Sequence, residues 1–140
     1  MIRAHRCTKC TSDKPSVLHH GLEIDDAGVL NDAAWGWGFG HHVIVRYMND
    51  MLPEGVQQAL ADRDLSGAHL FCMYAHLDSL NVKTGDMLAP GAQIGTCGET
   101  GNSRGVHLHL EVRAGFDPDM TQGFAPLLAN LLNPDLLFAR

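Results

Sequence analysis

Residues 105–113 read Gly-Val-His-Leu-His-Leu-Glu-Val-Arg, and this strict alternation constrains the fold more than any other segment of the chain. Side chains alternate across a β-strand, so residues two positions apart lie on the same face. We therefore expect His107 and His109 to share one face and Leu108 and Leu110 to share the other. Two neighbouring imidazoles can bind a divalent metal, move a proton or stabilise developing charge. The alternative is a pair of histidines on a solvated strand face.

Glycines separate several more short runs that are rich in β-branched or alternating residues, which predicts a predominantly β chain. We expect strands at residues 17–20, 42–47, 69–75, 93–96 and 106–113. Residues 53–62 predict a short inserted helix with proline in its first turn. Residues 125–132 predict a C-terminal helical turn, which Asn133 and Pro134 end.

Length and charge limit the function classes that fit the chain. Its 140 residues suit one domain, and we expect residues 1–140 to form a single core. The formal net charge of -6 and the absence of any Lys/Arg cluster argue against nucleic-acid binding. No apolar run is long enough to span a bilayer, and no apolar core of a signal peptide follows the first residues. We expect a soluble chain without an export signal.

The four cysteines are too few to indicate a disulfide framework in a domain of this size. Cys72 lies in a strand-like run and Cys97 in a glycine loop, and we expect both to be small buried residues. Cys7 and Cys10 have the spacing of a metal-binding knuckle, although no second cysteine pair has matching spacing. Nearby histidines could complete a zinc site there, and the role of this pair is left open.

Several motifs together resemble the lysostaphin-type zinc metallopeptidases, enzymes that cut peptide cross-bridges in bacterial cell walls. In order, they are Tyr-Ala-His-Leu at 74–77, Val-Lys-Thr-Gly-Asp at 82–86, Gly-Glu-Thr-Gly-Asn-Ser at 98–103 and His-Leu-His-Leu-Glu-Val at 107–112. Upstream, residues 38–45 resemble a strand of the family, with His41 where asparagine is usual. The resemblance covers residues 38–134 well and residues 1–36 poorly.

The resemblance implies an all-β, mostly antiparallel, two-sheet domain of the duplicated-hybrid-motif (barrel-sandwich) type. It implies a zinc-dependent endopeptidase that hydrolyses peptidoglycan peptides in the cell envelope, outside the cell or in a phage. By resemblance, His109 would be a Zn²⁺ ligand, and His76 and His107 would flank the metal-bound water. One or both of these imidazoles would act as general base or stabilise the tetrahedral oxyanion.

The remaining zinc ligands are harder to place, because the family's His-x-x-x-Asp motif is not intact near the start of the chain. One alignment uses His19 and Glu23 as the missing ligands. The other, which we favour, treats residues 16–21 as a later strand of the family and residues 22–36 as a long hairpin loop. The ligand-bearing segment would then be absent, either because the chain is truncated at its N-terminus or because the domain has lost its metal.

Two further function classes remain open beside the zinc peptidase. The first is a non-catalytic, metal-free relative that binds cell-wall peptide or a protein partner through the same groove. The second is a phosphocarrier of the sugar-transport type, which shares this fold and also brings two histidines together but fits the His-Leu-His spacing less well. The scissile bond, the cell-wall type and the oligomeric state are not determined by the sequence.

Overall fold

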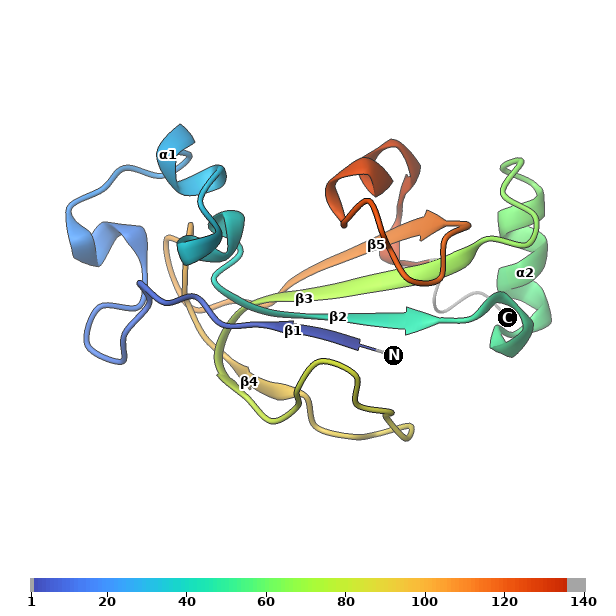
Figure 1. The fold of residues 1–140 in the computed structure, drawn as a ribbon, viewed down its shortest axis with the longest axis horizontal. Helices are drawn as coiled ribbons and strands as arrows, with labels where there is room; N and C mark the ends of the chain where they lie inside the picture. Colours follow the sequence, from blue (N-terminus) through green and yellow to red (C-terminus); the bar gives the residue numbers. More distant parts are fainter. Residues whose placement is uncertain (1, 136–140) are drawn as a thin grey trace. The chain divides into compact units, whose positions relative to one another are not determined.

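The computed structural model of the chain describes residues 2–135 (Figure 1). Its strands are β1 (Ile2–His5), β2 (His41–Tyr47), β3 (His69–Leu80), β4 (Gly95–Cys97), β5 (His109–Gly115) and β6 (Leu131–Leu132). Its α-helices are α1 (Ala27–Leu30) and α2 (Glu54–Ala61). Short 3-10 helices are η1 (Val17–His20), η2 (Ala33–Gly38), η3 (Asn49–Met51) and η4 (Ala125–Asn130).

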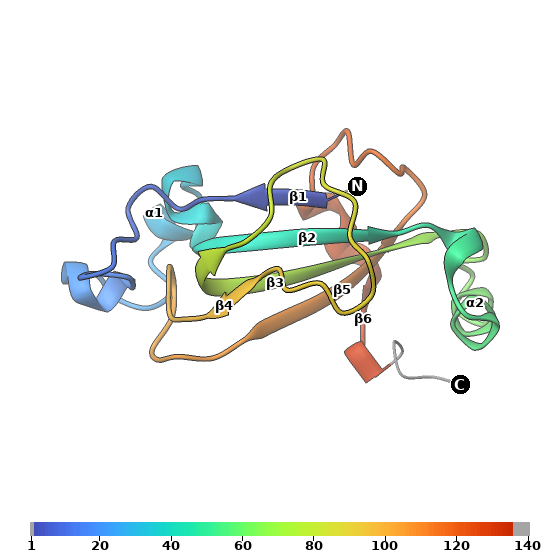
Figure 2. The ribbon, with the colours of Figure 1, turned by 90° about the horizontal axis from the view of Figure 1, so that it is seen from below.

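Within residues 2–135, the strands form one six-stranded sheet in the order β1-β2-β3-β5-β6, and β4 pairs with β3 beside this path (Figure 2). The β3–β4 and β5–β6 pairs are antiparallel. The expectation of a mostly antiparallel all-β fold with few helices is confirmed. The sequence missed β1, and it placed the start of β5 three residues too early.

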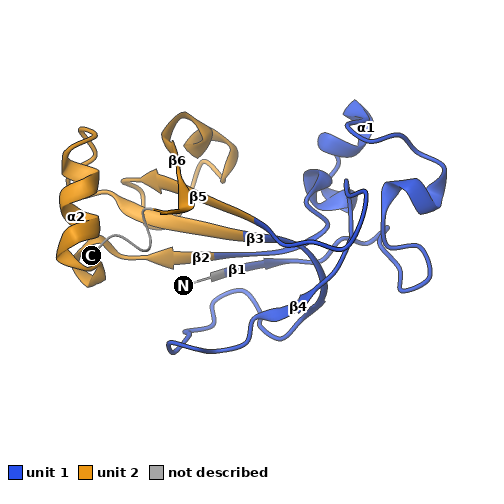
Figure 3. Cartoon of the chain, turned by 180° about the vertical axis from the view of Figure 1, so that it is seen from behind, with its two compact units in different colours: residues 1–44, 74–109 blue, residues 45–73, 110–140 orange. Residues whose placement is uncertain are grey.

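The contacts of the chain divide it into two compact units (Figure 3). Unit 1 comprises Met1–Ile44 and Tyr74–His109, and unit 2 comprises Val45–Met73 and Leu110–Arg140. The strands β2, β3 and β5 each contribute residues to both units. No helix in the described part of the chain is long and apolar enough to cross a membrane.

Unit 2 has an apolar core. The helix α2 buries Val56 and Leu60, which lie four positions apart and so on the same helical face. This helix confirms the prediction at residues 53–62. The 3-10 helix η4 confirms the helical turn predicted at residues 125–132, except that the last two of these residues form β6. On β5, the Arg113 Nε–H donates to the Glu111 carboxylate over 2.8 Å, so this carboxylate is paired rather than solvated.

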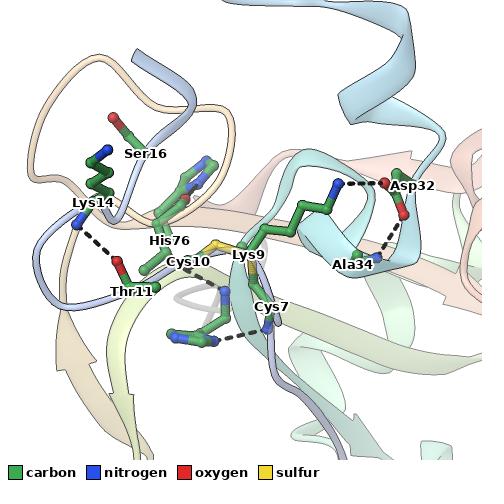
Figure 4. The surroundings of a disulfide bond; sticks show 12 residues. Cys7, Lys9, Cys10, Thr11, Lys14, Ser16, Asp32, Ala34 and His76 are labelled. Carbon is green, nitrogen blue, oxygen red and sulfur yellow. Dashed lines mark hydrogen bonds and ion pairs between the residues drawn. A yellow bond between two sulfur atoms is a disulfide. The ribbon is translucent and has the colours of Figure 1, made fainter. Parts of the chain in front are cut away.

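Unit 1 carries a disulfide that the sequence analysis did not predict. It joins Cys7 and Cys10, whose Cα atoms are 5.4 Å apart, and closes only a very short loop (Figure 4). Both cysteines are buried in a cluster that includes Trp35. Between them, Lys9 forms an ion pair with Asp32, also drawn in Figure 4. The pair is therefore a disulfide in this structure and not a zinc knuckle.

The segment after the disulfide differs from the favoured alignment. Residues 17–20 form η1 and not a strand, because Ser16 caps the turn and Gly21, with φ of 73°, ends it. Residues 22–36 hold α1 and most of η2 rather than a hairpin loop. A run as short as residues 17–20 does not distinguish strand from helix by its pattern, and only Val17 of the four residues is buried.

Candidate functional site

His76 lies on β3 and is buried, with 5% of its surface exposed. Its backbone N–H donates to the Phe39 carbonyl over 2.9 Å, and its Nδ1–H donates to the Thr100 carbonyl over 2.7 Å. Because a carbonyl can only accept, the Nδ1 atom carries the proton, and the Nε2 lone pair of the neutral ring is left as an acceptor. The backbone of His76 is in the left-handed region, with φ of 59°, which only a fixed tertiary environment maintains.

The structure brings His107 and His109 to His76. The ring centroid of His76 lies 4.9 Å from that of His107 and 5.7 Å from that of His109. His107 precedes β5 and forms an isolated bridge with Gly98, while His109 is the first residue of β5. The Nδ1–H of His107 donates to the Gly105 carbonyl over 2.9 Å. The three histidines singled out by the sequence therefore form one cluster.

Electrostatics keep the buried member of this cluster neutral. Burial lowers the pKa of His76 to about 4, and the neighbouring His107 and His109 imidazoles act in the same direction. The hydrogen bond to the Thr100 carbonyl opposes this shift without overcoming it. At pH 7 the ring of His76 is therefore an unprotonated base.

A second group of rings in unit 1 contacts the first through Phe39. The Phe39 ring lies 5.9 Å from the His109 ring and 5.8 Å from the His42 ring. His42 in turn stacks on His5 at 5.1 Å, and Trp37 lies 4.9 Å from His5. Burial lowers the pKa of His42 to about 4, so its ring, like that of His76, is neutral at pH 7.

The glycine loop at residues 98–103 helps to hold His76 in place through Thr100. Thr100 is buried, with 2% exposed; its carbonyl holds His76, and its hydroxyl donates to the Leu77 carbonyl over 2.8 Å. The same hydroxyl accepts the backbone N–H of His41 over 3.1 Å. The sequence analysis noted His41 only as a departure from the family and missed the roles of both His41 and Thr100. Hydrogen bonds to backbone groups leave no sequence motif beyond the glycines that permit the close approach.

His19 and Glu23, the alternative zinc ligands, are engaged elsewhere or exposed. His19 Nδ1 accepts from the Ser16 hydroxyl over 2.7 Å, and its Nε2 lies 3.5 Å from a Glu99 carboxylate oxygen. Glu23 lies on the surface. Across residues 2–135, no group of three or more His, Cys, Asp or Glu side chains is arranged to hold one metal ion. The donors present therefore do not fit a complete catalytic zinc site, which needs three protein ligands.

A buried neutral imidazole with two further imidazoles beside it can take part in general acid–base catalysis. The family model described as Peptidase family M23 matches residues 63–120, a segment that contains all three histidines. This match supports the resemblance to the lysostaphin-type peptidases that the motifs of the sequence predicted.

Two known proteins are similar to the chain. It is 28% identical over 110 residues to the peptidoglycan DD-endopeptidase ShyC of Vibrio cholerae serotype O1, covering 79% of the chain and 20% of the relative. The chain thus spans about a fifth of that protein's length. It is 29% identical to the solved catalytic domain of the antimicrobial peptidase lysostaphin from Staphylococcus simulans, covering 68% of the chain and 59% of that domain with a TM-score of 0.41.

Proposed function

We propose that the chain hydrolyses peptide bonds of bacterial peptidoglycan. The observation that carries the proposal is the cluster of His76, His107 and His109 in unit 1. The match to Peptidase family M23 supports it, as does the similarity to a protein named as a peptidoglycan endopeptidase. The place of action we propose is the cell envelope or the outside of the cell, where this substrate lies.

In this proposal His76 is the general base. Its Nδ1–H is committed to the Thr100 carbonyl, so its Nε2 lone pair takes a proton from water as the water oxygen attacks the peptide carbonyl. The carbon–nitrogen bond then breaks, and the proton passes to the leaving amine. Because burial keeps the ring neutral at pH 7, this lone pair is available. A positioned base of this kind contributes about a hundredfold or more in rate.

His107 is the second imidazole that we assign to catalysis. Its ring is exposed and lies 4.9 Å from that of the buried His76. His107 can therefore contact the same substrate as His76 from the solvent side. Its Nδ1–H is held by the Gly105 carbonyl, which fixes the ring plane. When protonated at Nε2, it donates to the carbonyl oxygen as negative charge develops there.

The family implies zinc, and the sequence analysis assigns His109 as one of its ligands. That assignment stays a prediction, because the donors within residues 2–135 do not assemble into a group that would complete the site around His109. The proton transfer assigned to His76 and the hydrogen bond assigned to His107 need no metal. The zinc content of the protein is therefore the first quantity to measure.

The test combines zinc stoichiometry with a cleavage assay on purified peptidoglycan peptides. About one tightly held zinc ion per chain, lost in His109→Ala, would support a metallopeptidase. New amino groups released by the wild type, but at least a hundredfold more slowly by His76→Ala, would support the role of the base. No cleavage by wild-type protein, with or without added zinc, would contradict the proposal.

A non-catalytic relative that binds wall peptide is the second candidate. The observation that favours it is the absence, among residues 2–135, of a three-donor metal group. It predicts saturable binding of the same peptides with no release of amino groups, and binding that His107→Ala weakens. The cleavage assay and the binding assay on one set of peptides separate the two candidates.

A further inference from the structure

A series of hydrogen bonds runs from the disulfide to His76 within unit 1. The backbone N–H of Cys7 donates to His41 Nδ1 over 2.9 Å. The backbone N–H of His41 donates to Thr100 Oγ1 over 3.1 Å. The Thr100 carbonyl accepts the Nδ1–H of His76 over 2.7 Å. Figure 4 shows the disulfide end of this series, and each bond joins segments that are far apart in sequence.

The members of the series have little freedom to move independently. Thr100 and Cys7 are almost fully buried, with 2% and 3% exposed. Gly40 has φ of 66° and packs so tightly on Thr100 that a Cβ at this glycine would lie 2.5 Å from the Thr100 carbonyl oxygen. In a close-packed interior, a displacement at one position is transmitted to the next. A shift of His41 would therefore displace Thr100 and, with it, the acceptor of His76.

His41 accepts the hydrogen bond from Cys7 in its neutral form, and its surroundings favour that form. Burial, followed by the charge of Arg6, lowers the pKa of His41 below its ordinary value. The neutral ring keeps a lone pair on Nδ1, which is the atom that accepts from Cys7. The disulfide holds Cys7 close to Cys10 and so keeps the donor N–H in one position.

We propose that His41 is a positioning residue for His76, acting through Thr100, and that the Cys7–Cys10 disulfide anchors it. The proposal rests on the function proposed for His76 as general base. His76 must keep its proton on Nδ1 for Nε2 to act as a base, and only a carbonyl in the right place selects that tautomer. The disulfide thus supports the active tautomer from a distance, without contacting substrate.

The sharpest test compares two substitutions at one position. Asparagine, the residue usual at this place in the family, carries a side-chain oxygen close to the position of Nδ1, so His41→Asn keeps an acceptor for the Cys7 N–H. Leucine has a similar volume and no acceptor. We expect His41→Leu to lower kcat on the order of tenfold with little change in KM, and His41→Asn to retain most of the activity.

A second readout does not depend on cleavage. The ¹⁵N shifts of the His76 ring nitrogens report which nitrogen carries the proton, and the wild type and His41→Asn should show the Nδ1–H form. We expect His41→Leu to give a mixture of both tautomers. Unchanged His76 signals in His41→Leu, or equal behaviour of the two variants, would overturn the proposal. If the wild type cleaves no peptide, the proposed function fails, while these spectra still decide whether His41 positions His76.

The anchoring role of the Cys7–Cys10 disulfide is tested with His41, Thr100 and His76 all unchanged. This test remains available if His41→Leu does not fold. Dithiothreitol transfers two electrons and two protons to the disulfide, giving the Cys7 and Cys10 thiols and the oxidised reagent. The Cys97→Ser background removes the exposed free thiol, and Cys72 is buried. Complete reduction should mix the His76 tautomers, and reoxidation should restore them. His76 signals that stay unchanged after complete reduction would refute the anchoring role.

Discussion

The two units are stabilised in different ways. Unit 2 is built on buried apolar side chains of α2, β3 and β5, among them Leu60, Phe71 and Val112, each with no exposed surface. Unit 1 also buries apolar side chains, among them Val17, Val29 and Trp35, but it contains eight of the nine histidines, all except His69, and many hydrogen bonds join its distant backbone and side-chain groups. Apolar packing tolerates exchange of similar residues, whereas a hydrogen-bonded network requires particular atoms. The proposed chemistry lies in the unit of the second kind.

The largest loss of stability is expected when a buried apolar side chain of unit 2 is truncated. Phe71 is fully buried on β3, so Phe71→Ala should lower the free energy of unfolding by about 3–5 kcal/mol through lost burial and a residual cavity. Phe116→Ala is the matched control, because Phe116 is 58% exposed and its truncation should change stability by about 0.5 kcal/mol or less. Urea unfolding of both variants measures the difference. Equal losses would show that packing does not govern unit 2.

The next largest loss of stability is expected in unit 1, where the backbone of Gly40 lies close to that of Thr100. A Cβ at Gly40 would meet the Thr100 backbone at 2.5 Å, and φ is 66°, so Gly40→Ala adds a clash to backbone strain. Gly85 has φ of 94° with no atom near its Cβ position, so Gly85→Ala carries strain alone. We expect a loss of about 3 kcal/mol at Gly40 and about 1 kcal/mol at Gly85. Thermal unfolding checks this, and similar losses at both positions would exclude a tight contact at Thr100.

The sequence predicted different parts of the two units with different success. The helix α2 follows from apolar spacing and proline placement. The alternation at residues 107–112 predicts that His107 and His109 share one face, and both rings lie near His76 in the structure. The prediction that His76 lies near these two histidines came from the family motifs, because no local sequence pattern reports a contact between separate strands. The disulfide and the role of Thr100 were missed, because both arise from tertiary placement of groups that are locally unremarkable in sequence.

Acid should destabilise the chain partly through His42. Burial lowers the pKa of His42 to about 4 in the folded chain, against about 6.5 when unfolded. Between these values the unfolded chain binds the extra proton, so stability is lost as the pH falls from about 6.5 towards 4. His42→Gln removes this titration and should flatten the loss relative to wild type, while Met51→Gln, at an exposed side chain that carries no proton, should not. Denaturant midpoints at pH 7 and pH 4.5 measure it, and parallel losses in all three proteins would contradict it.

The last prediction involves no substitution and compares the reactivity of one cysteine thiol from each unit. Burial among apolar residues raises the pKa of Cys72, in unit 2, to about 12, so almost no thiolate forms there at pH 8. Cys97, in unit 1, is exposed, which corrects the expectation that both cysteines are buried. Iodoacetamide at pH 8 should therefore label Cys97 alone in the folded protein and both cysteines in urea, as peptide mass measurement would show. Equal labelling rates under native conditions would mean that the core of unit 2 opens as readily as the surface of unit 1.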